Sequence, residues 1–162
     1  YIAGNHDFNL GTFFTTHLGI TVHSDRYLTW SGNKKICCMH GDGLSPSDWK
    51  YRIAKRIIRN PINNILFKII HPDWGMALAR FVGNKSRYAQ KDNQPVIHEY
   101  EASARAILKE ESADIFIQGH LHTPYASNQE DGLFVVNGDW LFSLNYISID
   151  NGEVTQSLYQ ID

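Results

Sequence analysis

Cysteine is scarce in this chain of 162 residues. The two cysteines, Cys37 and Cys38, are neighbours within an apolar run and are therefore poorly placed to bridge to each other. Reduced thiols in a cytosolic protein are the simpler expectation. Because the chain has no Cys-x-x-Cys pair, a structural zinc site is not expected either.

Long apolar runs and the signatures of two enzyme classes are also missing. No apolar run approaches the roughly 20 residues that a membrane-spanning helix needs. The sequence contains no Gly-x-Ser-x-Gly nucleophile elbow and no glycine-rich phosphate-binding loop. These absences argue against a serine hydrolase with that elbow and against a P-loop nucleotide hydrolase.

Acidic residues are nearly absent from one stretch. Residues 50–87 hold nine of the fifteen Lys and Arg residues and a single acid, Asp73. Their helical pattern, broken by Pro61 and Pro72, predicts a group of short amphipathic helices. Such a basic group is typical of attachment to an anionic membrane face. The alternative is an ordinary helical subdomain with a solvated basic face.

The rest of the chain alternates short strands with helices, which predicts an α/β fold. Helices are expected at residues 8–18 and 95–111, and strands at 20–23, 27–30, 35–39, 114–117, 133–136, 144–149 and 154–161. The last three strands are expected to form a meander, with Asn151-Gly152 as a hairpin turn. Because residues 1–3 have the pattern of a strand already under way, we expect more of the same domain upstream.

Glycine-flanked polar motifs follow three of the predicted strands: Gly4-Asn5-His6-Asp7, His40-Gly41-Asp42 and Gly119-His120-Leu121-His122. Loops that leave the carboxyl edge of an open α/β sheet converge, so these motifs are expected to meet. Amide oxygens and imidazole nitrogens together suit one or two divalent ions such as Mn²⁺, Fe²⁺ or Zn²⁺. Each motif alone also fits an ordinary turn, and Asp42 could either orient His40 or serve as a turn residue. A hydrolase that uses metal-activated water is the best chemical fit.

In this order, the three motifs resemble the last three motifs of the calcineurin-like metallophosphoesterases. The earlier Asp-x-His and Gly-Asp-x-x-Asp motifs of that family are absent here, and the resemblance implies that they lie upstream. It implies a four-layer α-β-β-α sandwich, of which residues 1–162 form the C-terminal part of a single domain, with a helical lid insertion at residues 47–87. It also implies two divalent metal ions, with Mn²⁺ expected.

A narrower resemblance is to the UDP-2,3-diacylglucosamine pyrophosphatases of lipid A biosynthesis. It rests on Asp48 and Tyr51 after the second motif, on Asn84-Lys85-Ser86-Arg87 and on Gly138-Asp139-Trp140. It implies a hydrolase that cleaves the pyrophosphate of UDP-2,3-diacylglucosamine to lipid X and UMP. Such an enzyme is peripheral on the cytoplasmic face of the bacterial inner membrane. The implied partners are a nucleotide-linked glycolipid and an anionic membrane surface, without nucleic acid, and the oligomeric state stays open.

The resemblance also implies roles for individual residues. Asn5, His40 and His120 would ligate one metal, and His122 would help to ligate the other. His6, oriented by Asp7, would stand beside the phosphate as a proton donor or charge stabiliser. The candidates for contacts with glucosamine and phosphate are Asp48, Tyr51, Arg80, Asn84 and Arg87.

One position departs from the narrower pattern, because better-known members of the lipid A branch carry Arg where this chain has His6. The alternatives are therefore a metallophosphoesterase acting on a soluble nucleotide or phosphoprotein, and a metal-free scaffold on the same fold. Because ligands of the second metal are absent, we expect the chain alone to bind metal weakly and to be catalytically inactive. We also expect an exposed sheet edge that is prone to pairing with another chain.

Overall fold

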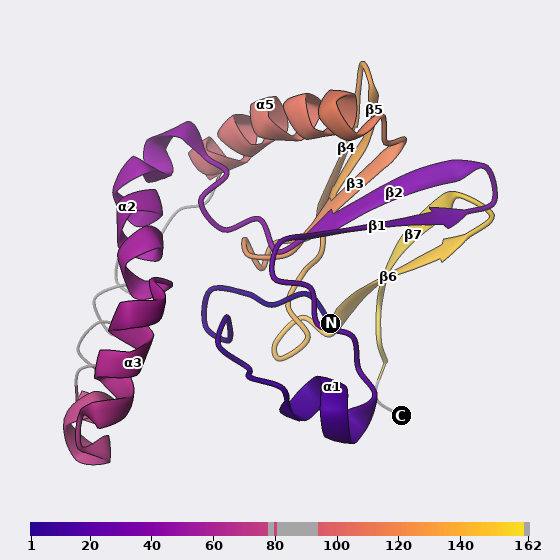
Figure 1. Ribbon diagram of the computed structural model, residues 1–162. Helices are drawn as coiled ribbons and strands as arrows, with labels where there is room; N and C mark the ends of the chain where they lie inside the picture. The colour runs from indigo at the N-terminus through magenta and orange to yellow at the C-terminus, as the bar shows by residue number, and fades with distance from the viewer. Residues whose placement is uncertain (78–79, 81–93, 161–162) are drawn as a thin grey trace. The chain divides into compact units, whose positions relative to one another are not determined.

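The computed structural model describes residues 1–77, 80 and 94–160, without the side chains of residues 64, 67, 68 and 94–96 (Figure 1). The chain divides into two compact units. The first consists of Tyr1–Leu44 together with Tyr100–Asp162, and the second consists of Ser45–Glu99.

A five-stranded mixed sheet forms the centre of the first unit, in the order β1-β2-β3-β5-β4. The strands are β1 (Arg26–Ser31), β2 (Lys34–Met39), β3 (Ile115–Gln118), β4 (Tyr125–Gln129) and β5 (Gly132–Val136). The strands β2, β3 and β5 run parallel, whereas β1 and β4 are antiparallel to their neighbours. Since Gln118 pairs with both Met39 and Val136, the three parallel strands end at the same edge.

Different elements cover the two faces of this sheet. The hairpin of β6 (Asn145–Asp150) and β7 (Glu153–Leu158) packs its apolar side chains on a cluster formed by Ile36, Ile115 and Val135. Alternate strand residues point to the opposite face. There Phe116 and Phe134 stack beneath α5 (Gln94–Glu111), whose inner residues are buried. The first unit therefore has three layers: a helix, the five-stranded sheet and the hairpin (Figure 1).

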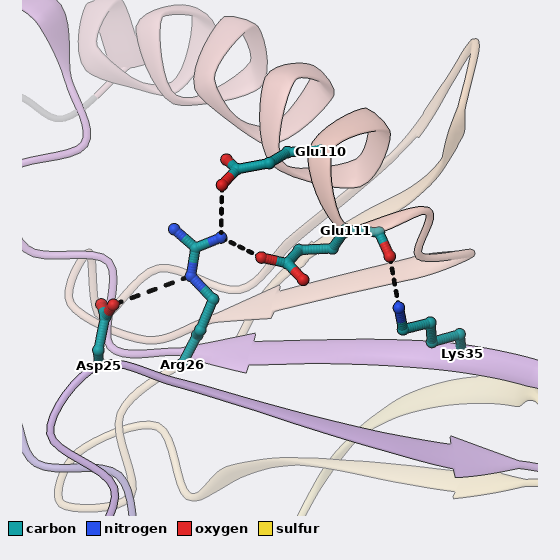
Figure 2. Close-up of polar contacts among 5 residues, drawn as sticks. All are labelled: Asp25, Arg26, Lys35, Glu110 and Glu111. Carbon is teal, nitrogen blue, oxygen red and sulfur yellow. Dashed lines mark hydrogen bonds and ion pairs between the residues drawn. The ribbon is translucent and has the colours of Figure 1, made fainter.

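An ion-pair network fastens the end of α5 to the sheet (Figure 2). The guanidinium of Arg26, at the start of β1, contacts the carboxylates of Glu110 at 3.3 Å and of Glu111. Asp25 lies 3.9 Å from the same guanidinium. Lys35 on β2 donates a hydrogen bond to the backbone oxygen of Glu111, which satisfies a carbonyl group of the last helical turn. The hydrogen bond with Glu111 raises the pKa of Arg26 further above its usual value.

In the second unit, a short 3₁₀ turn, η1 (Pro46–Asp48), leads into α2 (Trp49–Ile58) and α3 (Pro61–Ile69). The two ends of the unit are joined, because the hydroxyls of Ser45 and Ser47 donate hydrogen bonds to the carboxylate of Glu99. These bonds lower the pKa of Glu99. Eight large apolar side chains of α2 and α3 are between 48% and 76% exposed: Trp49, Ile53, Ile57, Ile58, Ile62, Ile65, Leu66 and Ile69.

Several predicted elements are confirmed at close to their expected bounds, namely β1, β2, β3, β5, α5, β6 and β7. The turn at Asn151-Gly152 is confirmed as well, since both residues have the positive φ of a type I′ turn, 48° and 84°. Cys37 and Cys38 are free thiols, as expected. Within the described ranges, no helix is long and apolar enough to cross a membrane.

Three predictions of local structure were wrong. The helix expected at residues 8–18 is shorter, α1 (Phe13–Leu18), although it ends at Gly19 as expected. Residues 20–23 form a single bridge, between His23 and Ile2, rather than a strand. The last strands do not form a meander, because β5 lies between β3 and β4 and the hairpin β6-β7 forms its own sheet. The strand β4 escaped prediction because its sequence, Tyr-Ala-Ser-Asn-Gln, is largely polar and lies at a sheet edge.

Candidate metal centre

Polar segments meet at the edge where the three parallel strands end. His40 follows β2 and His120 follows β3 after one glycine. The loop that carries Asn5 reaches the same place, since its side chain hydrogen-bonds with His40. The convergence expected from the sequence is therefore present for these three residues.

The three side chains bring their donor atoms close together. Nε2 of His40 lies 2.9 Å from Oδ1 of Asn5 and 3.3 Å from Nδ1 of His120. Two ligands at right angles, each about 2.1 Å from one ion, are separated by about 3 Å. The observed spacing therefore fits shared ligation of one ion, and one oxygen with two imidazole nitrogens suits Mn²⁺, Fe²⁺ or Zn²⁺. The described part of the chain contains no group of three or more His, Cys, Asp or Glu residues that could hold a metal ion, and the third donor beside the two histidines is the amide oxygen of Asn5.

Glycine at position 4 makes room for the ring of His40. A Cβ at Gly4 would lie 3.0 Å from Cε1 and 3.1 Å from Nδ1 of His40, which is closer than ordinary contact. A Cβ at Gly119 would lie 3.7 Å from Nδ1 of His40, which is an ordinary contact. Packing within the protein therefore requires the small residue at Gly4 and not at Gly119.

The backbone around His120 and His122 is in an unfavourable conformation. Both residues have positive φ, 60° and 56°. The N–H of Leu121 donates to the oxygen of Gly119 at 2.7 Å, which closes a tight γ-turn at His120. Left-handed backbone costs roughly 1–2 kcal/mol for a residue with a Cβ, and such strain clusters at functional sites. Leu121 stands between the two histidines in the sequence, and its buried side chain anchors the turn.

His122 is not joined by a hydrogen bond to Asn5, His40 or His120, which are linked to one another. Its side chain is exposed and makes no hydrogen bond to any residue that the structure describes. It acts instead on Asp139, in the loop after β5. The N–H of Phe142 lowers the pKa of Asp139 most, and the charge of His122 lowers it further. Ligation of a second metal by His122 stays a prediction.

His6 is exposed, and its neighbour Asp7 is engaged elsewhere. The carboxylate of Asp7 accepts hydrogen bonds from the hydroxyl of Tyr1 and from the N–H of Gly4. The bond to Asp7 raises the pKa of Tyr1. Asp7 therefore supports the loop that carries Asn5, and its role in orienting His6 stays a prediction.

The five candidates for sugar and phosphate contacts all come from the second unit. Asp48 ends η1 and Tyr51 is half-buried on α2. Arg80 is exposed. Asn84 and Arg87 lie outside the described residues. Their role in binding stays a prediction.

Gln118, the last residue of β3, was not singled out from the sequence. Its side chain is 0% exposed, and neither Oε1 nor Nε2 has a hydrogen-bond partner among the residues described. A Cβ on Gly41, whose φ is 96°, would lie 2.9 Å from Oε1 of Gln118, so this amide packs directly beneath the loop after His40. An unpaired buried amide costs about 1–3 kcal/mol, so stability does not account for glutamine here. The sequence signal that could have identified Gln118 was a polar residue at an inward-facing position of a strand predicted to be buried.

Several known proteins that are similar to this chain carry the same name. The chain is 29% identical over 160 residues to a UDP-2,3-diacylglucosamine hydrolase of Porphyromonas gingivalis, covering 87% of the chain and 61% of the relative. Proteins of the same name from Chromohalobacter salexigens and Tolumonas auensis are 26% and 25% identical, over 86% and 95% of the chain. The resemblance to the UDP-2,3-diacylglucosamine hydrolases is confirmed. The chain spans 59% and 65% of the length of these last two relatives.

The other comparisons add less. No family model matches the chain. Vacuolar protein sorting 29 of Cryptosporidium parvum aligns over 84% of this chain and 56% of its own length, with 13% identity and a TM-score of 0.39. That score is too low to carry an argument about the fold.

Proposed function

We propose that this chain is the C-terminal part of a metallophosphoesterase that hydrolyses the pyrophosphate of UDP-2,3-diacylglucosamine to UMP and lipid X. The observation that carries the proposal is the convergence of Asn5, His40 and His120, whose donor atoms lie 2.9 and 3.3 Å apart at the edge where the parallel strands end. The shared name of the relatives, UDP-2,3-diacylglucosamine hydrolase, supports the choice of substrate.

Divalent ions bound at such a site activate water and stabilise the charge that develops on phosphate oxygens. Asn5, His40 and His120 would hold one ion, and His122 would contribute to the second. Because an amide and two neutral imidazoles carry no negative charge, they would leave the positive charge of the first ion available to an anionic pyrophosphate. His6 is exposed next to Asn5 and would donate a proton or a hydrogen bond to the departing phosphate oxygen.

The proposal includes the wider architecture. The three layers of the first unit would belong to a four-layer α-β-β-α sandwich, with residues 1–162 as the C-terminal part of one domain. Residues 47–87 would be a helical lid that receives acyl chains. Two observations support this role: residues 45–99 form a compact unit of their own, and α2 and α3 expose apolar side chains. Asp48, Tyr51 and Arg80 would contact the sugar and phosphate from this lid.

The charge on the second unit favours an anionic membrane surface as a partner. Residues 49–69 contain six basic side chains and no acid. Exposed apolar side chains beside basic ones are the composition of helices that lie on anionic bilayers. We therefore propose a peripheral enzyme on the cytoplasmic face of the bacterial inner membrane, where its lipid-linked substrate would be found.

The test is hydrolysis of UDP-2,3-diacylglucosamine by the complete gene product in the presence of Mn²⁺, with UMP measured by chromatography. We expect His40→Ala to lower the rate by ~100-fold or more, because it removes the donor that lies between Asn5 and His120. His17→Ala is the matched control, since His17 is an exposed residue of α1, and this variant should keep the wild-type rate. Equal rates for wild type and His40→Ala would refute the proposed site.

A second outcome separates the proposed substrate from the proposed chemistry. An enzyme that releases no UMP but cleaves bis(p-nitrophenyl) phosphate, with the same loss in His40→Ala, would be a phosphoesterase for a soluble substrate. His6, which replaces the Arg of better-known lipid A enzymes, is the feature that would favour this alternative.

A further inference from the structure

The loop that joins β5 to β6 can be followed in Figure 1, and it carries a strongly exposed apolar pair. Leu141 and Phe142 are 83% and 91% exposed, more than any other large apolar side chain that the structure describes. The loop belongs to the first unit and leaves the same strand edge as His40 and His120. Removal of these two adjacent side chains from water would be favourable, because the free energy gained is roughly proportional to the apolar area buried.

Hydrogen bonds hold this loop in its conformation. The carboxylate of Asp139 accepts from the N–H groups of Phe142 and Ser143, and the hydroxyl of Ser143 donates to the backbone oxygen of Asp139 at 2.7 Å. At the base, the N–H of Gly138 donates at 2.9 Å to the buried side chain of Asn145. Leu141 and Phe142 are therefore presented outward by a fixed turn.

The same bonds give two backbone N–H groups of the tip a partner. A backbone N–H that enters a bilayer without a partner costs several kcal/mol, and here the N–H groups of Phe142 and Ser143 already have one. No charged side chain occurs in residues 140–149. Trp140 lies against Tyr159, with ring centroids 5.7 Å apart. Trp and Tyr are the side chains enriched at the border between hydrocarbon and headgroups.

We propose that Leu141 and Phe142 insert into the hydrocarbon border of a lipid bilayer, with Trp140 and Tyr159 at the level of the headgroups. This goes beyond the proposed function, because the anchor lies outside α2 and α3 and requires neither metal nor catalysis. It attaches the strand edge that carries His40 and His120 to the membrane surface. Unlike the basic helices, it binds through apolar contact and does not need anionic lipid.

The experiment is co-sedimentation of the protein with vesicles of phosphatidylcholine alone, which carry no net charge, in buffer with EDTA. We expect the wild type to bind and the double variant Leu141→Ser/Phe142→Ser to partition ~10-fold or more less strongly. Trp30→Ser is the matched control, because Trp30 is an exposed aromatic residue of β1 and should not contribute. Brominated phosphatidylcholine should quench part of the tryptophan fluorescence of the wild type, and Trp140→Phe should remove that part.

Several results would overturn the proposal. They are absence of wild-type binding to the phosphatidylcholine vesicles, binding by the double variant that equals that of the wild type, a loss in Trp30→Ser as large as in the double variant, and quenching in Trp140→Phe that is as strong as in the wild type. A wild-type dimer that the double variant converts to monomer, with vesicle binding unchanged, would show that a second copy of the chain covers the loop. A wild-type protein that binds the vesicles but releases no UMP would count against the proposed function and leave the membrane anchor standing.

Discussion

Nε2 of His40 lies 2.9 Å from Oδ1 of Asn5, although 35 residues separate the two along the chain. Gly4 packs against the ring of His40 and immediately precedes Asn5, so one short segment both supplies a donor atom and limits where the imidazole can lie. The position of His40 thus depends on a residue that contributes no ligand atom. This dependence can be tested without removing any candidate ligand.

Gly4→Ala should weaken metal binding. The added methyl group would lie 3.0 Å from Cε1 of His40 and would push the ring away from Asn5. We expect an affinity for Mn²⁺ that is ~10-fold lower, as for other changes around metal ligands. Isothermal titration of the complete gene product with Mn²⁺ measures it. Gly119→Ala is the control, since its methyl group would make an ordinary 3.7 Å contact with the same ring. Equal losses in both variants would contradict the argument.

The two glutamates at the end of α5 should differ in their contribution to stability. Glu111 contacts Arg26 with a side chain that is 17% exposed, whereas the side chain of Glu110 is 64% exposed. Hydrogen bonds to a charged group are stronger when shielded from water, and exposed pairs contribute little. We expect Glu111→Gln to lower the free energy of unfolding by about 1 kcal/mol and Glu110→Gln by less than about 0.5 kcal/mol. Urea denaturation of both variants decides this, and equal losses would show that Arg26 does not discriminate between them.

The strands of the sheet were predictable where local pattern and burial agree. Residues 35–39 and 114–117 are mostly apolar, and a histidine next to a glycine stands within the three residues that follow each run, so both the strand and its end could be predicted. The strand β4 was not, because Ala, Ser and Asn have little intrinsic preference for extended structure. It becomes a strand through its antiparallel pairing with β5, and its own sequence does not predict this pairing.

The candidate site, like the sheet, could be predicted in part from the sequence. The motifs identified Asn5, His40 and His120 as polar residues at strand ends, and the register of β2 and β3 explains why two of them meet. The engagement of Asp7 by Tyr1 and Gly4 could not be foreseen, since it depends on how the first residues fold back on the chain. Gln118 was missed for a similar reason. That its amide has no hydrogen-bond partner among the described residues is a property of the packed core and not of the sequence around it.

Asp114 should make the free energy of unfolding depend on pH in the acidic range. The N–H of Lys35 donates to one carboxylate oxygen at 2.8 Å, and the ammonium of Lys34 donates to the other at 2.9 Å. These bonds lower the pKa of Asp114 in the folded state. A lowered pKa stabilises the folded state above the unfolded value of about 4, and this stability is lost as the pH falls through the folded pKa.

The variant Asp114→Asn cannot show this loss of stability at low pH, because asparagine has no carboxyl group to protonate. We expect it to be less stable than wild type at pH 7, with a difference that shrinks as the pH falls from about 4 toward 2. Urea midpoints measured over that range test the prediction. Asp131→Asn, at an exposed position between β4 and β5, should keep the pH dependence of the wild type. A constant difference between wild type and Asp114→Asn at every pH would contradict the assigned cause.

The backbone at His122 should reverse the usual ranking of alanine and glycine. At φ = 56° a Cβ is strained, so His122→Gly should be more stable than His122→Ala by about 1 kcal/mol. His17 lies in α1, where alanine is favoured over glycine by about 1 kcal/mol, so the same pair of substitutions there should show the opposite order. Both variants at each position lack the imidazole, and metal binding by that ring cannot account for a difference between them. Urea unfolding in EDTA measures all four, and an alanine variant at position 122 that matches or exceeds the glycine variant would show that the left-handed turn is absent.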